Sequence, residues 1–296
     1  MDQPLTLLEM ITESLELLLV PFLGIELFLL WRIKALKWSQ RTKEMVTNVL
    51  AIVVTYTGVF LAYPLWERLF ESMETVLPYS VPTNVVTIVA AIFIADFVYY
   101  WEHRLEHEKR GLWALWHSVH HSSPEYDVTT SMRLGFFDGL LTLFFHLPLI
   151  LLGFEPIVAI AANAFVISYQ TWIHTELIQK MPRWFEAIFN TPSHHRAHHG
   201  ADEIYLDKNY GAVLIVWDRI FGTFQEERFR PTYGLTKQIE SSHPLDVQLS
   251  ELRDLLADLK ADTSWGMRWR RIWNRPGWQR ESIGDHNPQL VSRGSN

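Results

Sequence analysis

The chain has 296 residues, of which 48% are hydrophobic and 20% charged, a composition that excludes a disordered or fibrous protein. Because it contains no cysteine, a disulfide scaffold, a zinc finger, an iron–sulfur cluster and a thiol nucleophile are also excluded. The formal net charge of -7 argues against a nucleic-acid partner, which would need a basic surface.

Several long apolar segments predict membrane-spanning helices. Residues 46–66 hold no charged side chain, and about 20 such residues are needed to cross a bilayer. Residues 79–101, 134–154 and 156–173 are similar, whereas 15–31 contains two glutamates and is the weakest candidate. Since the last two spans are separated by a very short turn, we expect them to form a hairpin. The predicted fold is all-α: a multi-pass transmembrane helical bundle of about four to five spans with a cytoplasmic, helical, histidine-rich cap.

The short loops predict the orientation of these spans. Residues 32–45 carry five Lys or Arg, whereas residues 67–82 carry a single Arg among three Glu. By the positive-inside rule the first of these loops is cytoplasmic. Following the spans in order then places residues 103–133, and everything from His174 to the C-terminus, on the cytoplasmic face. A bacterial inner membrane and an endoplasmic reticulum share this charge pattern, so both remain open.

The thirteen histidines are unevenly distributed. Three boxes stand out: HRLEH (103–107), HSVHH (117–121) and HRAHH (195–199). Histidines at i and i+4 lie on one face of a helix, whereas adjacent ones point about 100° apart, so one helix can serve two metal ions. The predicted ligands are His103, His107, His117, His120, His121, His174, His195, His198 and His199. His194 is a further candidate that breaks the register of the third box.

This many imidazoles favours a centre with two metal ions. Neutral imidazole binds iron, zinc, copper or nickel and adds no charge at the membrane boundary. Eight or more ligands exceed what one ion uses, whereas two ions about 3.5–4 Å apart would use them all. Solvated or pH-sensing histidines would leave the clustering unexplained.

Polar residues near the boxes are candidates for supporting roles. Asp96 shares a helical face with the first box, and we expect it to accept a hydrogen bond from a ligand histidine; helix packing or an ion pair is the alternative. Gln170 lies one turn before His174 as a polar partner. Three residues are candidates for lining a substrate cavity, and the last of them could instead be a hydrogen-bonded core residue: Asn163, Tyr100 and His146.

The three boxes, in this order and between these spans, resemble the fatty acid hydroxylase and sterol desaturase superfamily of membrane di-iron oxygenases. The resemblance covers residues 85–225, and the motifs DKNYG and WDRIFGTF are most similar to its alkylglycerol monooxygenase branch. It implies two iron ions on the predicted histidines, although purified protein could carry zinc. It also singles out Asp207 and Asn209 of DKNYG as supporting residues. One departure is Gln170, because some hydroxylases of the superfamily have a second histidine near the end of the hairpin; one metal would then have fewer protein ligands, or be completed by water.

The sequence is expected to divide into three regions, of which the resemblance covers the middle one. Residues 1–84 would form an N-terminal transmembrane region, and residues 85–225 the di-metal catalytic domain. Residues 226–296 would form a cytoplasmic region with an amphipathic helix near 247–260. The segment 264–280 interleaves four Trp with five Arg, which suits either contact with lipid headgroups or a plain aromatic cluster.

The activity that the resemblance implies is an O₂-dependent hydroxylation of a membrane lipid of ether-lipid, fatty acyl or sterol type. No dinucleotide-binding fingerprint or haem module is visible, so electrons would come from an external donor: a reduced pterin, or a separate reductase or cytochrome. A lipid or sterol desaturase would use the same site. From another class, a histidine-rich metal transporter or a metal-binding scaffold remains possible, although a transporter would place its ligands at the bilayer midplane. The oligomeric state stays open.

Overall fold

The structure of the chain is a computed structural model that describes residues 21–29, 31–32, 38–77 and 79–278. Within these ranges it leaves undescribed the side chains of residues 38–39, 74, 139–143 and 146. The described part of the chain is helical, and its extended pairing is limited to two isolated bridges, Phe189–Leu214 and Gly200–Tyr233. The all-helical fold class expected from the sequence is therefore confirmed.

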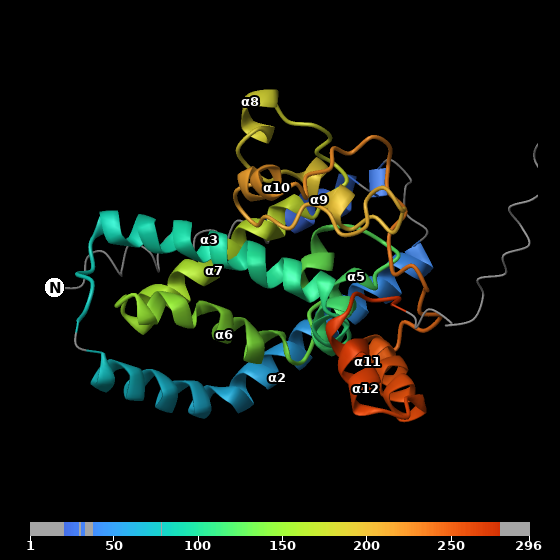
Figure 1. Ribbon diagram of the computed structural model, residues 1–296. Coiled ribbons are helices and arrows are strands. Elements are labelled where there is room, and N and C mark those ends of the chain that lie inside the picture. Colours follow the sequence, from blue (N-terminus) through green and yellow to red (C-terminus); the bar gives the residue numbers. More distant parts are fainter. Residues whose placement is uncertain (1–20, 30, 33–37, 78, 279–296) are drawn as a thin grey trace, which may run out of the picture.

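Four helices run side by side and form the elongated part of the molecule on the left of Figure 1. They are α2 (Trp38–Val76), α3 (Val85–Glu108), α6 (Asp138–Leu151) and α7 (Pro156–Ile173). The other helices lie at the right-hand end, with α8 and α10 above the middle of α3: α4 (Arg110–Leu112), η1 (Trp113–His117), α5 (Ser118–His121), η2 (Val128–Met132), α8 (Arg183–Glu186), α9 (Pro192–His198), α10 (Val216–Phe221), α11 (Pro244–Ala261) and α12 (Trp265–Trp273). We call these helices together the cap.

Helices α3 and α7 form the centre of the bundle. Helix α3 begins at a capping box in which Asn84 accepts from the backbone of Thr87 and the Thr87 hydroxyl bonds back to Asn84, and α7 begins with Pro156, which suits the first helical turn. Their facing positions are small and fully buried: Ala91, Ala95, Ala159 and Ala162. Small residues let two helix backbones approach closely.

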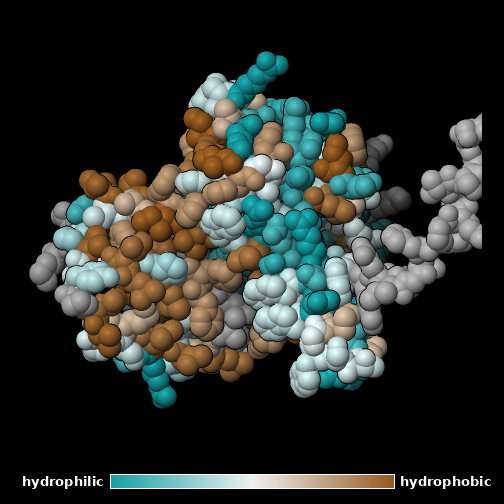
Figure 2. All heavy atoms as spheres, viewed as in Figure 1, coloured by the Kyte–Doolittle hydropathy of each residue, from teal (hydrophilic) through white to brown (hydrophobic). Residues whose placement is uncertain are grey.

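Three of the described helices are long and apolar enough to cross a membrane: Gln40–Met73, Val85–Glu108 and Pro156–Ile173. They correspond to the predicted spans 46–66, 79–101 and 156–173, except that the helix of the second span begins only at Val85. Their outer faces expose large apolar side chains, such as Phe60 and Val86 at 77% each, and Figure 2 shows this apolar surface over the left part of the molecule.

The predicted span 134–154 is shorter than expected. Helix α6 has 14 residues, or about 21 Å at 1.5 Å per residue, less than the ~30 Å of a hydrocarbon core. It starts late because residues 134–137 form a turn in which Gly135 lies against Trp116; a Cβ added there would be 2.7 Å from the Trp116 Cα. Helices α6 and α7 are in contact, but a membrane-crossing hairpin stays a prediction. Of the candidate span 15–31, residues 21–29 and 31 are described and are helical, and the rest lies outside the described residues.

Both turns at the left end of the bundle pack together. The Tyr79 hydroxyl donates to the Leu151 carbonyl, and the Val81 amide donates to the Gly153 carbonyl. The α2–α3 loop and the α6–α7 turn therefore share one end, and the cap lies at the other (Figure 1). In the cap, α11 covers the sequence region for which an amphipathic helix was predicted.

Candidate metal centre

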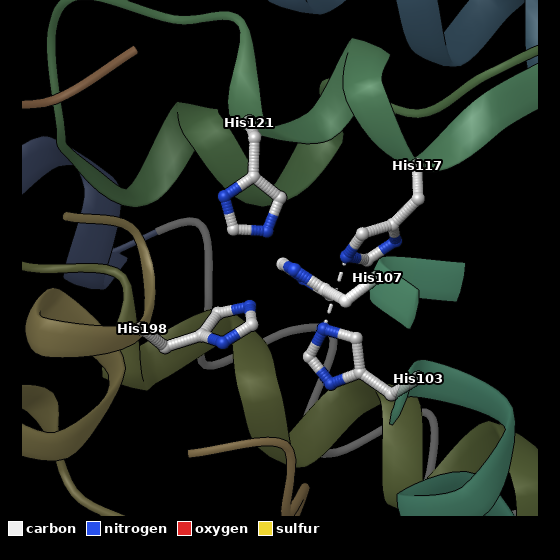
Figure 3. A group of neighbouring side chains, drawn as sticks. All are labelled: His103, His107, His117, His121 and His198. Atoms are coloured by element: carbon white, nitrogen blue, oxygen red, sulfur yellow. Dashed lines mark hydrogen bonds between the residues drawn. The ribbon is translucent and has the colours of Figure 1, made fainter. Parts of the chain in front are cut away.

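Nine histidines converge where the long helices meet the cap, and all are buried. They come from the end of α3, from η1 and α5, from the residue after α7, and from α9 with its following residue. The five-histidine group is His103, His107, His117, His121 and His198, and the four-histidine group is His120, His174, His195 and His199. Within each group the potential ligand nitrogens all lie within 4.8 Å of one another. Figure 3 shows the five rings of the first group gathered around one point.

The histidine boxes divide between the two groups as helix geometry requires. His120 belongs to one group and His121 to the other, and His198 and His199 are split in the same way. The middle box begins in a π-helical turn, Trp113–His117, which the sequence spacing did not predict. Such turns are rare and concentrate at functional sites. Because adjacent residues serve different groups, the two groups lie side by side.

Acceptors behind the rings fix the orientation of five histidines. A ring that donates through Nδ1 keeps its Nε2 lone pair free for a metal. The Nδ1 contacts are His103 to the Tyr210 carbonyl at 2.9 Å, His117 to the Glu106 carboxylate at 2.8 Å, His120 to the Arg133 carbonyl at 3.3 Å, His174 to the Gln170 carbonyl at 2.7 Å, and His198 to the Lys208 carbonyl at 2.8 Å.

The inward-facing nitrogens have the chemistry of a metal site. Nε2 of His103 lies 3.0 Å from Nε2 of His117, and Nε2 of His195 lies 2.9 Å from that of His174. Nδ1 of His103, of His117 and of His174 each donates to another group, so the Nε2 atoms of these rings carry lone pairs. The contact between His103 and His117 therefore brings two lone pairs together. Further buried ring nitrogens have no hydrogen-bond partner within the described part of the chain: Nε2 of His107, His121 and His198. A cation in each group would satisfy these atoms, so both groups suit transition metal ions such as iron.

Burial keeps the cap histidines neutral. It lowers the pKa of His198 to about 3 and that of His174, just beyond the end of α7, to about 4. The pKa values of His120, His195 and His199 are also depressed, first by desolvation and then by neighbouring histidines. A neutral imidazole is the form that binds a metal, so these side chains need lose no proton at neutral pH.

Residues of the DKNYG motif lie directly behind the histidines. Asp207 Oδ1 is 3.7 Å from Nδ1 of His107. Asn209 donates to the carbonyls of His194 and Gln225 and accepts from the Gln225 amide, so it ties the start of the third box to the end of WDRIFGTF. Both residues have positive φ, 57° and 59°, which is uncommon outside glycine and is tolerated best by Asp and Asn.

Asp96 and Tyr100 do not have the roles expected for them. The Asp96 carboxylate accepts from the backbone amides of Val213 and Leu214 and from Nε1 of Trp217. Tyr100 bonds to Thr223 at 3.0 Å and stacks on Phe221 rather than facing a cavity. Both side chains point toward the segment 213–224. The helical spacing of residues 96–107 does not indicate where that segment lies.

Other predicted residues lie apart from the two groups. Asn163 is buried on α7 but does not line the cavities found beside the histidines. His194 packs on Phe224 and belongs to neither group. The side chain of His146 lies outside the described residues. Gln170 does contribute, since its carbonyl accepts from His174 and its side chain lines the cavity at the helix side of the centre.

Sequence reasoning missed Glu106. It stands inside the first box, between His103 and His107, and is 4% exposed. One carboxylate oxygen accepts from Trp116 Nε1 at 2.7 Å, and the other lies 2.8 Å from Nδ1 of His117. A carboxylate inside a histidine box is the signal that could have identified it, because ligating histidines usually donate to such a group.

Two cavities have histidines of the centre in their walls. The inner cavity, of about 80 Å³, lies between α3, α6 and α7, and its wall includes His117 of one group and His120 and His174 of the other. The outer cavity, of about 350 Å³, lies in the cap and touches the five-histidine group; its wall combines Trp113 with charged residues that include Arg110 and Lys237.

Comparison with known proteins agrees with this geometry. A family model described as "Fatty acid hydroxylase" matches residues 88–223. The chain is 39% identical to human alkylglycerol monooxygenase over 216 residues, which are 72% of this chain and 46% of the relative. It is 40% identical to the Xenopus tropicalis protein of the same name over 183 residues, 62% of this chain and 40% of the relative.

A more distant relative is bacterial. The ornithine lipid hydroxylase of Rhizobium tropici is 28% identical over 198 residues, 63% of this chain and 59% of the relative. No solved structure matches the fold. The chain spans less than half the length of the alkylglycerol monooxygenases it matches. The family match and the paired histidine groups together identify the chain as a membrane protein of the fatty acid hydroxylase superfamily.

Proposed function

We propose that the chain is an O₂-dependent di-iron monooxygenase that hydroxylates a membrane lipid. The observation that carries this proposal is the inner cavity, which lies between α3, α6 and α7 and has histidines of both groups in its wall. The five-histidine group would hold one iron and the four-histidine group the other, and the two ions would supply the activation of O₂.

The inner cavity suits the reacting carbon of a lipid. Tyr99, Leu134 and Ile167 form the apolar part of its wall, and Glu102, Glu106 and Asp138 form an acidic part. An alkyl segment entering from the bilayer would therefore reach the histidines along the apolar part. A carbon held in this cavity would lie beside the centre, and positioning of this kind accounts for much of the rate that an enzyme contributes. The lipid class follows from the names of the relatives: an ether lipid first, with acyl and sterol lipids as alternatives.

The overall reaction needs an external reductant. One O₂, two electrons and two protons convert a C–H bond into a C–OH group and water. We assign the entry of electrons to the outer cavity, because it reaches His107, His121 and His198 from the side away from the spans. A reduced pterin or a separate reductase or cytochrome would deliver them there.

The orientation and regions predicted from the sequence complete the proposal. Arg41 lies at the cap end of α2, where it binds Glu125 at 2.7 Å, and by the positive-inside rule the cap and the C-terminal region face the cytoplasm, in a bacterial inner membrane or the endoplasmic reticulum. Residues 85–225 act as the catalytic domain between regions 1–84 and 226–296.

Product analysis tests the proposed activity. The full chain, loaded with iron in lipid nanodiscs, is supplied with ¹⁸O₂, a chemical reductant and ether, acyl or sterol lipids in turn. We expect an alcohol that carries one ¹⁸O atom, and none from a His120→Ala protein. An alkene without ¹⁸O would identify a desaturase. Metal-loaded protein that yields neither product from any lipid class would contradict the proposal and favour a transporter or a scaffold.

A further inference from the structure

An exposed apolar surface on the cap is not used by the proposed reaction. It is formed by α8 and the residue Ile188 after it, together with α10. Its exposed large apolar side chains are Trp184 at 68%, Ile188 at 45%, Ile220 at 62% and Phe221 at 36%. We call these four residues the α8–α10 surface. Single exposed apolar residues are ordinary, whereas a contiguous group of large ones marks an interaction surface.

Backbone pairing makes α8 and α10 one unit. The Asn190 amide donates to the Val213 carbonyl, and the Ile215 amide donates to the Ile188 carbonyl. Phe189 and Leu214 form an isolated bridge. The two short helices therefore present their apolar side chains from a single platform.

This platform packs against α3 at Asp96, which lies before the end of the candidate membrane span Val85–Glu108. Asp96 accepts three hydrogen bonds from Val213, Leu214 and Trp217, and the Trp217 ring packs edge-on against Phe93 at 5.2 Å. Asp96 is eight residues before Arg104, the first basic residue of α3, or about 12 Å along the helix axis. Part of the cap thus reaches the depth of the apolar half of α3.

The exposed apolar surfaces of α3 and of the platform are continuous. Phe93 and Trp101 of α3 are 52% and 37% exposed, and Trp101 packs against Phe221 of α10 at 5.0 Å. Figure 2 shows the apolar surface of the bundle continuing onto the α8–α10 part at the upper edge of the molecule. Since α3 faces lipid at this level, its neighbour on the same surface faces lipid too.

We propose that the α8–α10 surface is immersed in the acyl-chain boundary of the leaflet nearest the cap. Interfacial segments bury their apolar side about 5–10 Å into that boundary, which suits the depth set by Asp96. Arg183, exposed at the start of α8, and Arg219, exposed beside Ile220 on α10, would extend to the phosphate layer. The cap is then anchored to the membrane by this surface as well as by the spanning helices to which it is joined. Asp96 accepts hydrogen bonds from the backbone amides of Val213 and Leu214, next to the inserted surface.

Site-directed spin labelling tests this proposal, because the chain has no native cysteine. The full chain is placed in phosphatidylcholine nanodiscs with one label at Ile188→Cys or, separately, at Ile220→Cys. Phe93→Cys on the exposed face of α3 is the lipid-facing reference, and Glu203→Cys on an exposed loop of the cap is the aqueous reference. Collision of each label with O₂ and with a water-soluble nickel chelate is measured.

We expect the ratio of oxygen to nickel collisions at Ile188 and Ile220 to be severalfold above that at Glu203 and close to that at Phe93. Nickel access equal to that at Glu203 would overturn the proposal. Protection from both agents with dipolar broadening between labels would overturn it as well, because a second copy of the chain would then cover the surface. The measurement needs neither metal nor substrate, so its failure would leave the proposed activity untouched.

Discussion

Replacement of Glu106 by glutamine should weaken one metal site and spare the other. The two carboxylate oxygens of Glu106 accept separately from Trp116 and from His117. An amide has a single acceptor oxygen, so Glu106→Gln leaves one of these buried donors facing an NH₂ group. His117 belongs to the five-histidine group, and losing the acceptor behind a ligating histidine costs about 10–100-fold in metal affinity, or about 1.4–2.7 kcal/mol.

Metal titration measures this effect. Metal-free protein in detergent is titrated with Co²⁺ in competition with a chelator, which gives one dissociation constant for each site. We expect the affinity of one site to fall by the factor above and that of the second to stay unchanged. Glu108→Gln is the matched control, because Glu108 lies on the same helix but pairs with Arg104 and Arg275. Equal affinities in the Glu106→Gln and wild-type proteins would refute the assigned role of this carboxylate.

Three further predictions concern stability. Burial lowers the pKa of His198 to about 3 and that of His174 to about 4, so below pH ~6.5 the unfolded chain binds more protons than the folded one. The metal-free protein should therefore have its full stability above that pH and lose up to about 1.4 kcal/mol per histidine and pH unit as the pH falls toward 4. Thermal unfolding measures this loss, and a melting temperature that does not depend on pH would contradict the prediction. Asp96→Ala leaves the buried donors of residues 213–217 unsatisfied, at a cost of about 1–3 kcal/mol each; denaturation should report the loss while the folded protein keeps both metals, and loss of metal alone would indicate a histidine-orienting role. Gly135→Ala places a Cβ 2.7 Å from Trp116 Cα and should destabilise the fold by about 1–3 kcal/mol. An unchanged unfolding midpoint would show that the turn before α6 can shift to accommodate the methyl group without loss of stability.

The histidine sets could be predicted from the sequence because their geometry is local. The spacing of HSVHH places His120 and His121 about 100° apart on one helix, whatever the rest of the chain does. The order of the boxes and of the apolar spans then suggested that they meet, and the structure brings nine of the ten predicted ligand histidines together. His194, next to His195 on α9, points elsewhere for the same local reason.

The roles of Asp96 and Tyr100 could not be predicted in this way. Their partners lie more than 110 residues later, in the segment 213–224, and a helical stripe does not say which non-local segment covers it. The length of α6 is a similar case. The hydropathy of 134–154 suggested a full span, but the close approach of Gly135 to Trp116 delays the start of the helix.

Metal analysis by mass spectrometry tests the central claim most directly. The full chain is purified in detergent from cells grown with added iron, beside His120→Ala, His121→Ala and, as a control outside both groups, His194→Ala. We predict two metal ions per chain in the wild-type and His194→Ala proteins, and a lower content in each of the other two variants, because each loses a ligand from a different group. One metal or none in folded wild-type protein would contradict the di-iron centre.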